Sequence, residues 1–297
     1  VDMSGAYLSD LNLSGVDLKH VTLTGADLSG TDLSGACLWD SNLTGVNLSG
    51  ADLSGADLRY ANLSDAELSS ADLSGSDLSG ANLYSAQLVG SNLTHANVSS
   101  SELAAANLNL STLEGADLSG SNLSSAQLIN ATLISANLSG ANLQNASLNG
   151  SDLRSVRSGG IIGNPESLPT DWAVVNGYLA GPFADLLSAD LAGVDLSEAN
   201  LSSAELGGAD LSGANLSGAD LSNAIFIEYV GNGWLDADLS GANLSGADLS
   251  GADLTYANLF EANLSSTDLS GAGLFGVRSG GIIGQPISDH YQVINGY

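Results

Sequence analysis

The sequence predicts an all-β fold in which the chain winds into a four-sided coil. A five-residue word recurs along most of the 297 residues: a small residue, Asp or Asn, Leu, and two polar residues or Gly. This period fits neither the 3.6 residues of a helical turn nor the two-residue alternation of a strand. A chain that turns a corner every five residues keeps the small residue and the Leu inside. Four such sides close a square coil of about 20 residues, and stacked coils form ladders.

The repeat is nearly unbroken, which supports this geometry. Words are centred from Met3 to Leu153, from Leu186 to Phe226 and from Leu239 to Leu274. Of the 48 centres, 45 are Leu, and the others are Met3, Val98 and Phe226. The first residue must be small because four Leu already crowd each square cross-section. The Ser-Gly that ends many words supplies corners, because Gly tolerates unusual backbone angles.

The 20-residue register predicts which side chains stack. We expect an inner column that contains Leu43, Leu63, Leu83 and Leu103. Beside it, an outer column should contain Asn42, Asn62 and Asn82. Asparagine amides stacked at the spacing of a β-ladder can bond one another, so this column favours an amide ladder.

Blocks such as ADLSGADLRYANLSDAELSSADLSG, residues 51–75, resemble the pentapeptide-repeat family, whose motif is A(D/N)LXX. The resemblance covers about four fifths of the chain. It implies a right-handed quadrilateral β-helix, a solenoid of about twelve coils with loop insertions. It also implies a bacterial protein without an assigned activity in the inserts.

The breaks in the repeat predict the organisation of the chain. Residues 1–155 form a first solenoid block, and residues 184–276 form a second block with a loop at 227–236. Residues 156–183 should be an insert within the same solenoid, a distorted coil with a protruding loop. Residues 277–297 repeat its VRSGGIIG motif and are interpreted as the start of a second, truncated insert, so we expect a segment of a longer protein. Ile161-Ile162 and Val174-Val175 are expected to be short strands, with a tight turn at Asn176-Gly177.

Composition excludes several kinds of ligand. The chain has 5 Lys and Arg against 33 Asp and Glu, a formal charge of −28. Phosphate backbones and anionic membranes both need basic residues, so nucleic acid and membrane partners are excluded. A protein partner, basic in character, fits this charge. The open edges of the terminal coils favour end-to-end self-association.

No pattern in the sequence predicts catalysis or a cofactor. The three histidines, His20, His95 and His290, are far apart, and Cys37 is the only cysteine. The glycine-rich nonapeptide that binds Ca²⁺ in β-solenoids is absent, and so is EF-hand spacing. We therefore expect no enzyme, no cofactor and no metal site. The chain shows no signal peptide and no apolar run long enough to span a membrane, so it should be soluble, with its compartment unknown.

These observations predict a non-enzymatic structural or protein-interaction scaffold, a rigid acidic rod. The alternative is a DNA-mimic protein that binds a DNA-processing enzyme such as gyrase, as the resemblance to quinolone-resistance members of the family implies. Duplex DNA carries about one charge per 1.7 Å, and an acidic solenoid of this length approaches that density. The acidic residues of this chain, however, encircle the coil and form no stripes.

If the repeat serves as a spacer, we expect a partner to be recognised by the segments that interrupt it. Two of the five basic residues, Arg157 and Arg278, occupy the same position in the two copies of the insert motif. Each is expected to pair with a carboxylate or carbonyl and to hold its loop against the coil. The candidate interaction or loop-anchoring residues are therefore Arg157, Trp172, Tyr178, Tyr229, Trp234 and Arg278.

Overall fold

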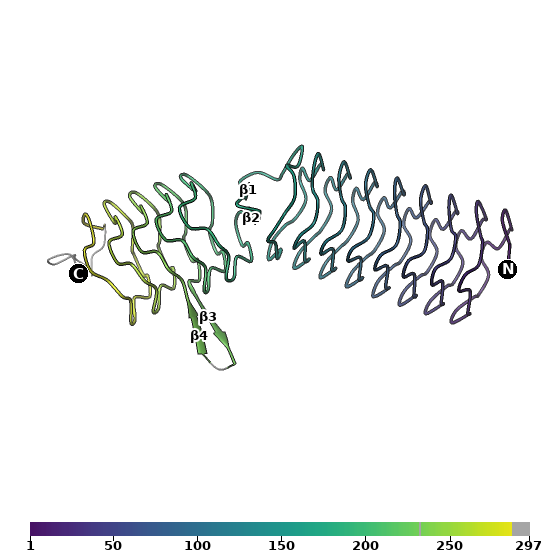
Figure 1. The fold of residues 1–297 in the computed structure, drawn as a ribbon, viewed down its shortest axis with the longest axis horizontal. Helices are drawn as coiled ribbons and strands as arrows, with labels where there is room; N and C mark the ends of the chain where they lie inside the picture. The colour runs from purple at the N-terminus through teal and green to yellow at the C-terminus, as the bar shows by residue number, and fades with distance from the viewer. Residues whose placement is uncertain (232, 287–297) are drawn as a thin grey trace. The chain divides into compact units, whose positions relative to one another are not determined.

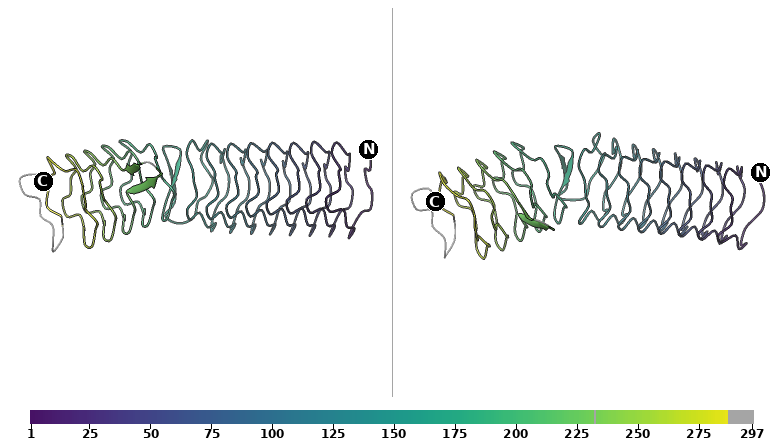
Figure 2. Two further views of the ribbon diagram at one scale, coloured as in Figure 1. Left: turned by 90° about the horizontal axis from the view of Figure 1, so that it is seen from below. Right: turned by 60° about the horizontal axis from the view of Figure 1, so that its bottom comes forward.

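The computed structural model describes residues 1–231 and 233–286, and within them the chain forms stacked four-sided coils (Figures 1 and 2). The chain divides into two compact units. The first comprises Val1–Val156 with Gly160–Thr170, and the second comprises Arg157–Gly159 with Asp171–Tyr297. In each unit, parallel bridges join residues 20 positions apart, such as Asp32 with Asp52. The predicted all-β solenoid with a 20-residue coil is therefore confirmed.

A word with Asp or Asn at its second position can place every backbone N–H on an acceptor, which explains its composition. Numbering the positions of a word from the small residue, the N–H groups of the second, third and fifth positions bond neighbouring coils. The N–H of the residue after the word donates to the carbonyl of the Leu within that word and so closes a turn. The N–H of the fourth position donates to the side chain of the Asp or Asn at the second position. For the word 51–55 these bonds are Asp52 N to Thr31 O, Leu53 N to Asp72 O, Ser54 N to Asp52 Oδ1, Gly55 N to Ser74 O and Ala56 N to Leu53 O, all between 2.7 and 3.0 Å.

The Asp or Asn is thus the side chain that supplies the acceptor missing from the backbone. Its oxygen often accepts a second bond from the hydroxyl of the fourth-position Ser, as from Ser29 to Asp27 at 2.7 Å. This hydroxyl and, secondarily, the Ser29 N–H hold the pKa of the Asp27 carboxyl below its ordinary value. The outward acidic side chains therefore take part in the folding of the word.

The core is formed by the first and third positions. Leu43, Leu63, Leu83 and Leu103 have no exposed surface, and their outward neighbours Asn42, Asn62 and Asn82 are joined by consecutive parallel bridges. The predicted columns are confirmed. Ser replaces Ala at several buried first positions because its hydroxyl bonds the carbonyl of the preceding Leu, as Ser76 does to Leu73 at 2.7 Å.

The predicted amide ladder is present in part, because the Asn62 amide donates to the Thr44 hydroxyl at 3.0 Å and not to Asn42. The side-chain amide of Asn82 donates to Asn62 Oδ1 at 3.1 Å, and Asn142 donates to Asn122 at the same distance. Other Asn residues donate to carboxylates one coil away, as Asn92 does to Asp72 at 3.0 Å. An amide between stacked carboxylates replaces repulsion with a hydrogen bond.

The fifth position is the corner of the coil, and its backbone is left-handed. Gly55 has φ of 63°, and non-glycine residues such as Tyr60 and Leu110 adopt the same conformation with φ of 59° and 63°. Only Gly adopts this region without a steric penalty, which explains the frequent Gly at the ends of words.

We expect Gly55→Ala to lower the thermal unfolding midpoint of the first unit, at a cost of about 1 kcal/mol. A Cβ at Gly55 would meet no atom within 4 Å, so the cost comes from the backbone alone. The neighbouring Ser54→Ala, at a position without positive φ, is the matched control and should leave the midpoint unchanged. Equal midpoints for the two variants would contradict this account of the corners.

The insert between the two blocks differs in part from expectation. Strand β1 (Ala173–Val175) pairs antiparallel with β2 (Tyr178–Ala180), across the expected turn at Asn176-Gly177. Ile161-Ile162, however, is not a strand of this kind. Ile162 forms a parallel bridge with Asn142, so the coil of the first unit continues into the insert motif. The prediction of a strand at Ile161-Ile162 was wrong because apolar residues occur both in hairpin strands and in the coils, so their character alone does not distinguish the two.

A second hairpin interrupts the second unit. Strand β3 (Ile227–Val230) pairs antiparallel with β4 (Gly233–Asp236), in the register Ile227 with Asp236 and Tyr229 with Trp234. Figure 1 shows the hairpin projecting from the coils of its unit. Its base is closed by the Ala237 N–H, which donates to Phe226 O at 3.0 Å, and Asp210 bridges Asp238 beyond it.

Candidate functional site

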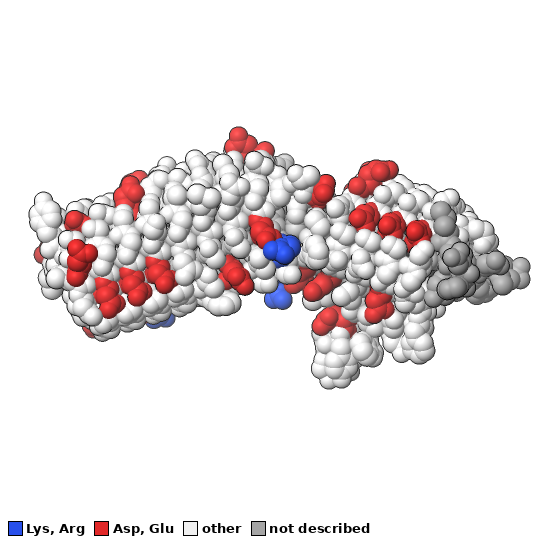
Figure 3. Space-filling view, turned by 180° about the vertical axis from the view of Figure 1, so that it is seen from behind, with Lys and Arg blue, Asp and Glu red and all other residues white. Residues whose placement is uncertain are grey.

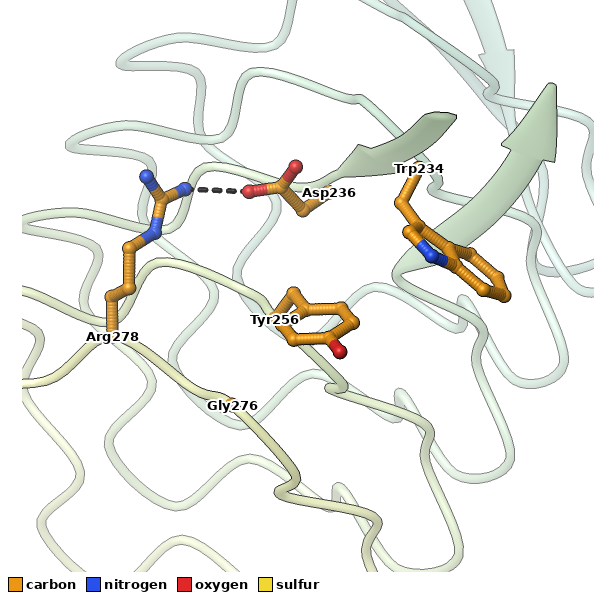
Figure 4. Close-up of a pocket in the computed structure, with 5 residues that line it drawn as sticks. All are labelled: Trp234, Asp236, Tyr256, Gly276 and Arg278. Carbon is orange, nitrogen blue, oxygen red and sulfur yellow. Dashed lines mark hydrogen bonds and ion pairs between the residues drawn. The ribbon is translucent and has the colours of Figure 1, made fainter. Parts of the chain in front are cut away.

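The strongest candidate site is a groove beside the β3–β4 hairpin. A pocket of about 370 Å³ is lined by Trp234, Asp236, Tyr256, Gly276 and Arg278. Trp234 and Asp236 come from β4, whereas the other three residues come from the two coils that follow the hairpin. Figure 4 shows the Tyr256 ring off the line between the Trp234 indole and the Arg278–Asp236 pair, so that rings and ion pair border the same pocket. We call this pocket the hairpin groove.

Aromatic contacts support both sides of the hairpin groove. The Trp234 and Tyr229 rings pack across the hairpin with centroids 4.9 Å apart and planes tilted by 58°. The Tyr256 and Phe275 rings meet edge to face, with centroids 5.5 Å apart. Such pairs stabilise the orientation of each ring beyond simple burial. Trp234 nevertheless remains 55% exposed, so much of its surface is open to solvent.

The position of the Tyr256 ring depends on Gly276, which lies one coil later. A Cβ at Gly276 would meet the edge of the Tyr256 ring, so only Gly lets the ring lie over this corner. The same fit recurs for Tyr60 over Gly80 and for His95 over Gly115. A bulky fifth-position side chain can therefore lie over the corner of the next coil where that corner is Gly.

An ion pair lies at the end of the groove opposite the indole. Arg278 Nη2 donates to Asp236 Oδ2 at 2.6 Å. The Arg278 side chain is 62% exposed and that of Asp236 is 33% exposed. Solvent screens a pair this exposed, so it contributes little to stability. It brings a guanidinium and a carboxylate side by side at the groove.

Ion pairing separates the five basic residues into two groups. Lys19, Arg59 and Arg154 each pair with the Asp two positions earlier in their own word, and Arg59 Nε also lies 3.9 Å from Asp77 Oδ2 in the next coil. Arg157 and Arg278 instead pair with carboxylates 28 and 42 residues away. The two arginines of the insert motif are thus the basic residues whose partners lie more than 20 residues away.

Comparison with known proteins agrees with this architecture. The family profile described as "Pentapeptide repeats (8 copies)" matches residues 2–40, 41–80, 61–99, 81–120, 121–157, 184–226 and 236–272. The chain belongs to the pentapeptide-repeat family. Proteins with this fold serve as scaffolds and interaction surfaces. No curated protein matches the chain.

Several solved pentapeptide-repeat structures are similar to this protein. HetL, from the cyanobacterium Nostoc sp. strain PCC 7120 and involved in heterocyst differentiation regulation, is 35% identical. The match covers 91% of this chain and 90% of HetL, with a TM-score of 0.31. Rfr23 from the cyanobacterium Cyanothece 51142 is 27% identical over 41% of this chain and 90% of its own, with a TM-score of 0.24. Full-length QnrB1, a plasmid-mediated fluoroquinolone resistance protein, is 19% identical over 95% and 92%, with a TM-score of 0.16.

The remaining candidate residues of this pentapeptide-repeat protein lie at the first insert. Arg157 Nε donates to Asp185 Oδ2 at 3.3 Å, and the Asp185 side chain is only 11% exposed. Trp172 and Tyr178 are partly buried against the core of the second unit. The Tyr178 hydroxyl accepts the Asp190 N–H at 3.2 Å.

The three residues of the insert therefore do not share the hairpin groove. Trp172 lines a second, smaller pocket of about 290 Å³, whose polar wall includes Asp171, Glu198 and Asn200. Asn200 Nδ2 donates to Asp171 Oδ2 at 3.3 Å across this wall.

Arg157 supplies positive charge beside partly buried carboxyl groups. Burial raises the pKa of the Glu205 carboxyl, Asp185 and Glu228 raise it further, and Arg157 counteracts them. Asp185 and Glu205 are also bridge partners in adjacent coils. Without the guanidinium, two neighbouring and partly buried carboxyls would face each other with no cation.

We expect Arg157→Ala to speed amide hydrogen exchange in the 156–183 insert, because Asp185 then loses its cation. The flanking words should stay protected, since their backbone bonds do not involve this side chain. Arg154→Ala is the matched control: Arg154 pairs within its own word, with Asp152 at 2.6 Å, and should change no exchange in the insert. Unchanged protection of the insert in Arg157→Ala would refute the anchoring role.

Sequence reasoning missed three residues of the hairpin groove: Asp236, Tyr256 and Gly276. Tyr256 and Gly276 are 20 positions apart, so extending the 20-residue register through the third block would have stacked them. No pattern in the sequence predicts the pairing of Asp236 with Arg278. It depends on the direction in which the hairpin leaves the coil.

Residues considered for other chemistry lie apart from both pockets. His20 Nδ1 is 3.0 Å from Asp40 Oδ2 and packs edge to face on Trp39. His290 and the rest of 287–297 lie outside the described residues. Within the part of the chain that the structure describes, no group of three or more His, Cys, Asp or Glu could hold a metal ion. The same part contains no helix with the length and apolar character needed to cross a membrane.

Proposed function

We propose that this protein is a non-enzymatic protein-interaction scaffold in which the coils support the recognition surface carried by the breaks. The observation that carries the proposal is the β3–β4 hairpin. It holds Tyr229 and Trp234 outside the coil with 58% and 55% of their surface exposed. Exposed, oriented aromatic side chains are enriched at the centres of protein interfaces.

The outward side chains of the words are consistent with coils that serve as support and a hairpin that serves for recognition. Asp and Asn at the second position accept the fourth-position N–H of their own word, as Asn62 does from Ser64 at 3.1 Å. Many also bond the next coil. These groups are occupied in holding the coil, whereas the exposed rings of Tyr229 and Trp234 pack on each other.

The charge of the chain suggests the character of the partner. With a formal charge of −28, the chain attracts basic surfaces over distances of about a Debye length and repels acidic ones. Figure 3 shows acidic side chains in short rows on one face, with few basic groups among them. A basic protein partner fits this field.

The DNA-mimic alternative receives less support from the arrangement of charge. Along the bridge-paired columns, the longest rows hold three carboxylates, such as Asp32, Asp52 and Asp72. Neutral residues then interrupt the row, in this case Asn92. A duplex, in contrast, presents two continuous lines of phosphate. We therefore expect no inhibition of DNA supercoiling by gyrase.

A deletion that restores the repeat tests the scaffold proposal. Removing residues 227–234 joins Phe226 to Leu235 and returns the next centre, Leu239, to a spacing of five. The hairpin disappears while the coil gains an uninterrupted word. This variant should keep the thermal unfolding midpoint of the wild type. It should lose the partner captured from an extract of the source organism and identified by mass spectrometry.

The matched control for the deletion is Tyr84→Ala, which removes an exposed aromatic residue from an unbroken coil. Its partner capture should equal that of the wild type. Equal capture by all three proteins would show that the breaks do not carry recognition. Inhibition of gyrase supercoiling by the wild type and the deletion variant alike would favour the DNA-mimic alternative.

A further inference from the structure

The hairpin groove has features of a small-molecule site that protein docking does not require. It presents aromatic ring surface on one side and a fixed ion pair on the other. Its volume of about 370 Å³ lies at the low end of the range for ligand pockets. A ligand of this size is one sugar ring rather than an extended peptide.

The aromatic side suits a ring with an apolar face. Tyr229 packs on the Trp234 indole, and Phe275 meets the Tyr256 ring, so both rings are braced from outside the groove. A pyranose carries several C–H groups on one face, and these pack against the electron-rich face of an aromatic ring. Braced rings lose little conformational entropy when a ligand stacks on them.

The polar side suits neighbouring hydroxyls. Among the described residues, the side chains of Arg278 and Asp236 share one hydrogen bond, from Nη2 to Oδ2. Arg278 Nη1 and Nε and Asp236 Oδ1 keep their capacity for a ligand. A vicinal diol can accept from the guanidinium with one oxygen and donate to the carboxylate with the other. The ion pair thus matches both hydrogen-bonding roles of a sugar hydroxyl.

The net charge of the groove selects against ionic ligands. Arg278 and Asp236 cancel each other, so the polar side is neutral although the chain as a whole carries −28. An anionic ligand would be repelled by the surrounding field. A cationic ligand would meet a carboxylate that is already paired with the Arg278 guanidinium. A neutral polyhydroxylated ligand meets neither penalty.

We propose that the hairpin groove binds a neutral pyranose at the end of a carbohydrate. The sugar ring stacks between Trp234 and Tyr256, and two adjacent hydroxyls bond Arg278 and Asp236. This site goes beyond the scaffold function and does not depend on it. A protein partner can still engage the hairpin if no sugar binds, so the two proposals fail separately.

Saturation-transfer NMR with the methyl glycosides of glucose, galactose and mannose tests the site. At about 20 mM glycoside, at least one should show transfer that is strongest for protons on one face of its ring. Absence of transfer for all three would overturn the proposal. So would a tri-lysine peptide that binds the groove when no glycoside does, because the acidic field would then decide the ligand.

Matched substitutions locate the binding. Trp234→Phe keeps a ring face and should retain transfer, whereas Trp234→Leu keeps only apolar volume and should weaken binding about tenfold. Tyr256→Leu, at a coil corner and off the hairpin, should weaken binding similarly. This second variant keeps the test valid if Trp234→Leu disturbs the hairpin.

Two further variants examine the polar side and the specificity of the signal. Arg278→Lys removes the planar guanidinium fork while keeping the charge, and it should also weaken binding about tenfold. Tyr84→Ala, an aromatic substitution on an unbroken coil, should leave binding unchanged. Equal binding by the wild type, Trp234→Leu, Tyr256→Leu and Arg278→Lys would place the sugar elsewhere and overturn the proposal.

Discussion

Leu83→Asp should unfold the coils around residue 83, at a cost on the order of 5 kcal/mol. Leu83 has no exposed surface and lies in an uninterrupted column of Leu. The substitution removes apolar contacts and places a carboxylate where no cation and no water can reach it. Hydrogen exchange should show lost protection in the coil that contains residue 83 and in the coils above and below it.

The neighbouring position provides the control for this substitution. Tyr84→Asp introduces the same charge one residue later, where the side chain is 49% exposed. Its backbone N–H keeps its bond to Asn82 Oδ1 at 3.0 Å, because this bond does not involve the side chain. A stability change below about 1 kcal/mol is expected. Comparable losses in the two variants would contradict the assignment of inner and outer faces.

Ala86→Leu should have the second largest effect, a loss of about 3 kcal/mol from overpacking. Ala86 is fully buried at the first position of a word, beside the Leu columns that fill the cross-section. The coil cannot widen to admit three more carbon atoms without breaking ladder bonds, such as the one from Gln87 N to Ala66 O at 2.9 Å. Thermal unfolding measures the loss.

The same substitution at an outward position separates overpacking from a general effect of Leu. Ala104 occupies the fourth position of its word and is partly exposed. Ala104→Leu should therefore leave the unfolding midpoint near that of the wild type. A midpoint lowered as far as in Ala86→Leu would show that the small first position is not set by the space inside the coil.

Most of the fold was predictable from the repeat because each word places the same residue types in equivalent inner and outer positions. Leu63 and Leu83 fill equivalent inner sites, and Asn62 and Asn82 fill equivalent outer ones. One solution therefore describes every coil. The role of Asn62 as an acceptor for the Ser64 N–H was not visible in the sequence, because the direction of a side-chain bond does not follow from periodicity.

The candidate site was predictable only in part because it lies where the repeat fails. Exposed Tyr229 and Trp234 were identified from their position in a break, and the structure brings Trp234 and Arg278 to one groove. The contribution of Asp236 depends on how the hairpin leaves the coil. Ile161-Ile162 was misassigned because its bridge to Asn142 depends on a continuing coil that the motif conceals.

The 156–183 insert and the β3–β4 hairpin both show how a gene for such a protein can change length. Asp210 bridges Asp238 and Arg157 bridges Asp185, each 28 residues on rather than 20, so each interruption adds eight residues. The words beyond Asp238 keep their order in the columns. An insertion of this kind therefore leaves each later word in its column, and doubling the length of the inserted loop costs only about 0.6 kcal/mol of closure entropy. Recombination can thus splice new segments into the solenoid, and foreign peptides can be grafted in place of the β3–β4 hairpin.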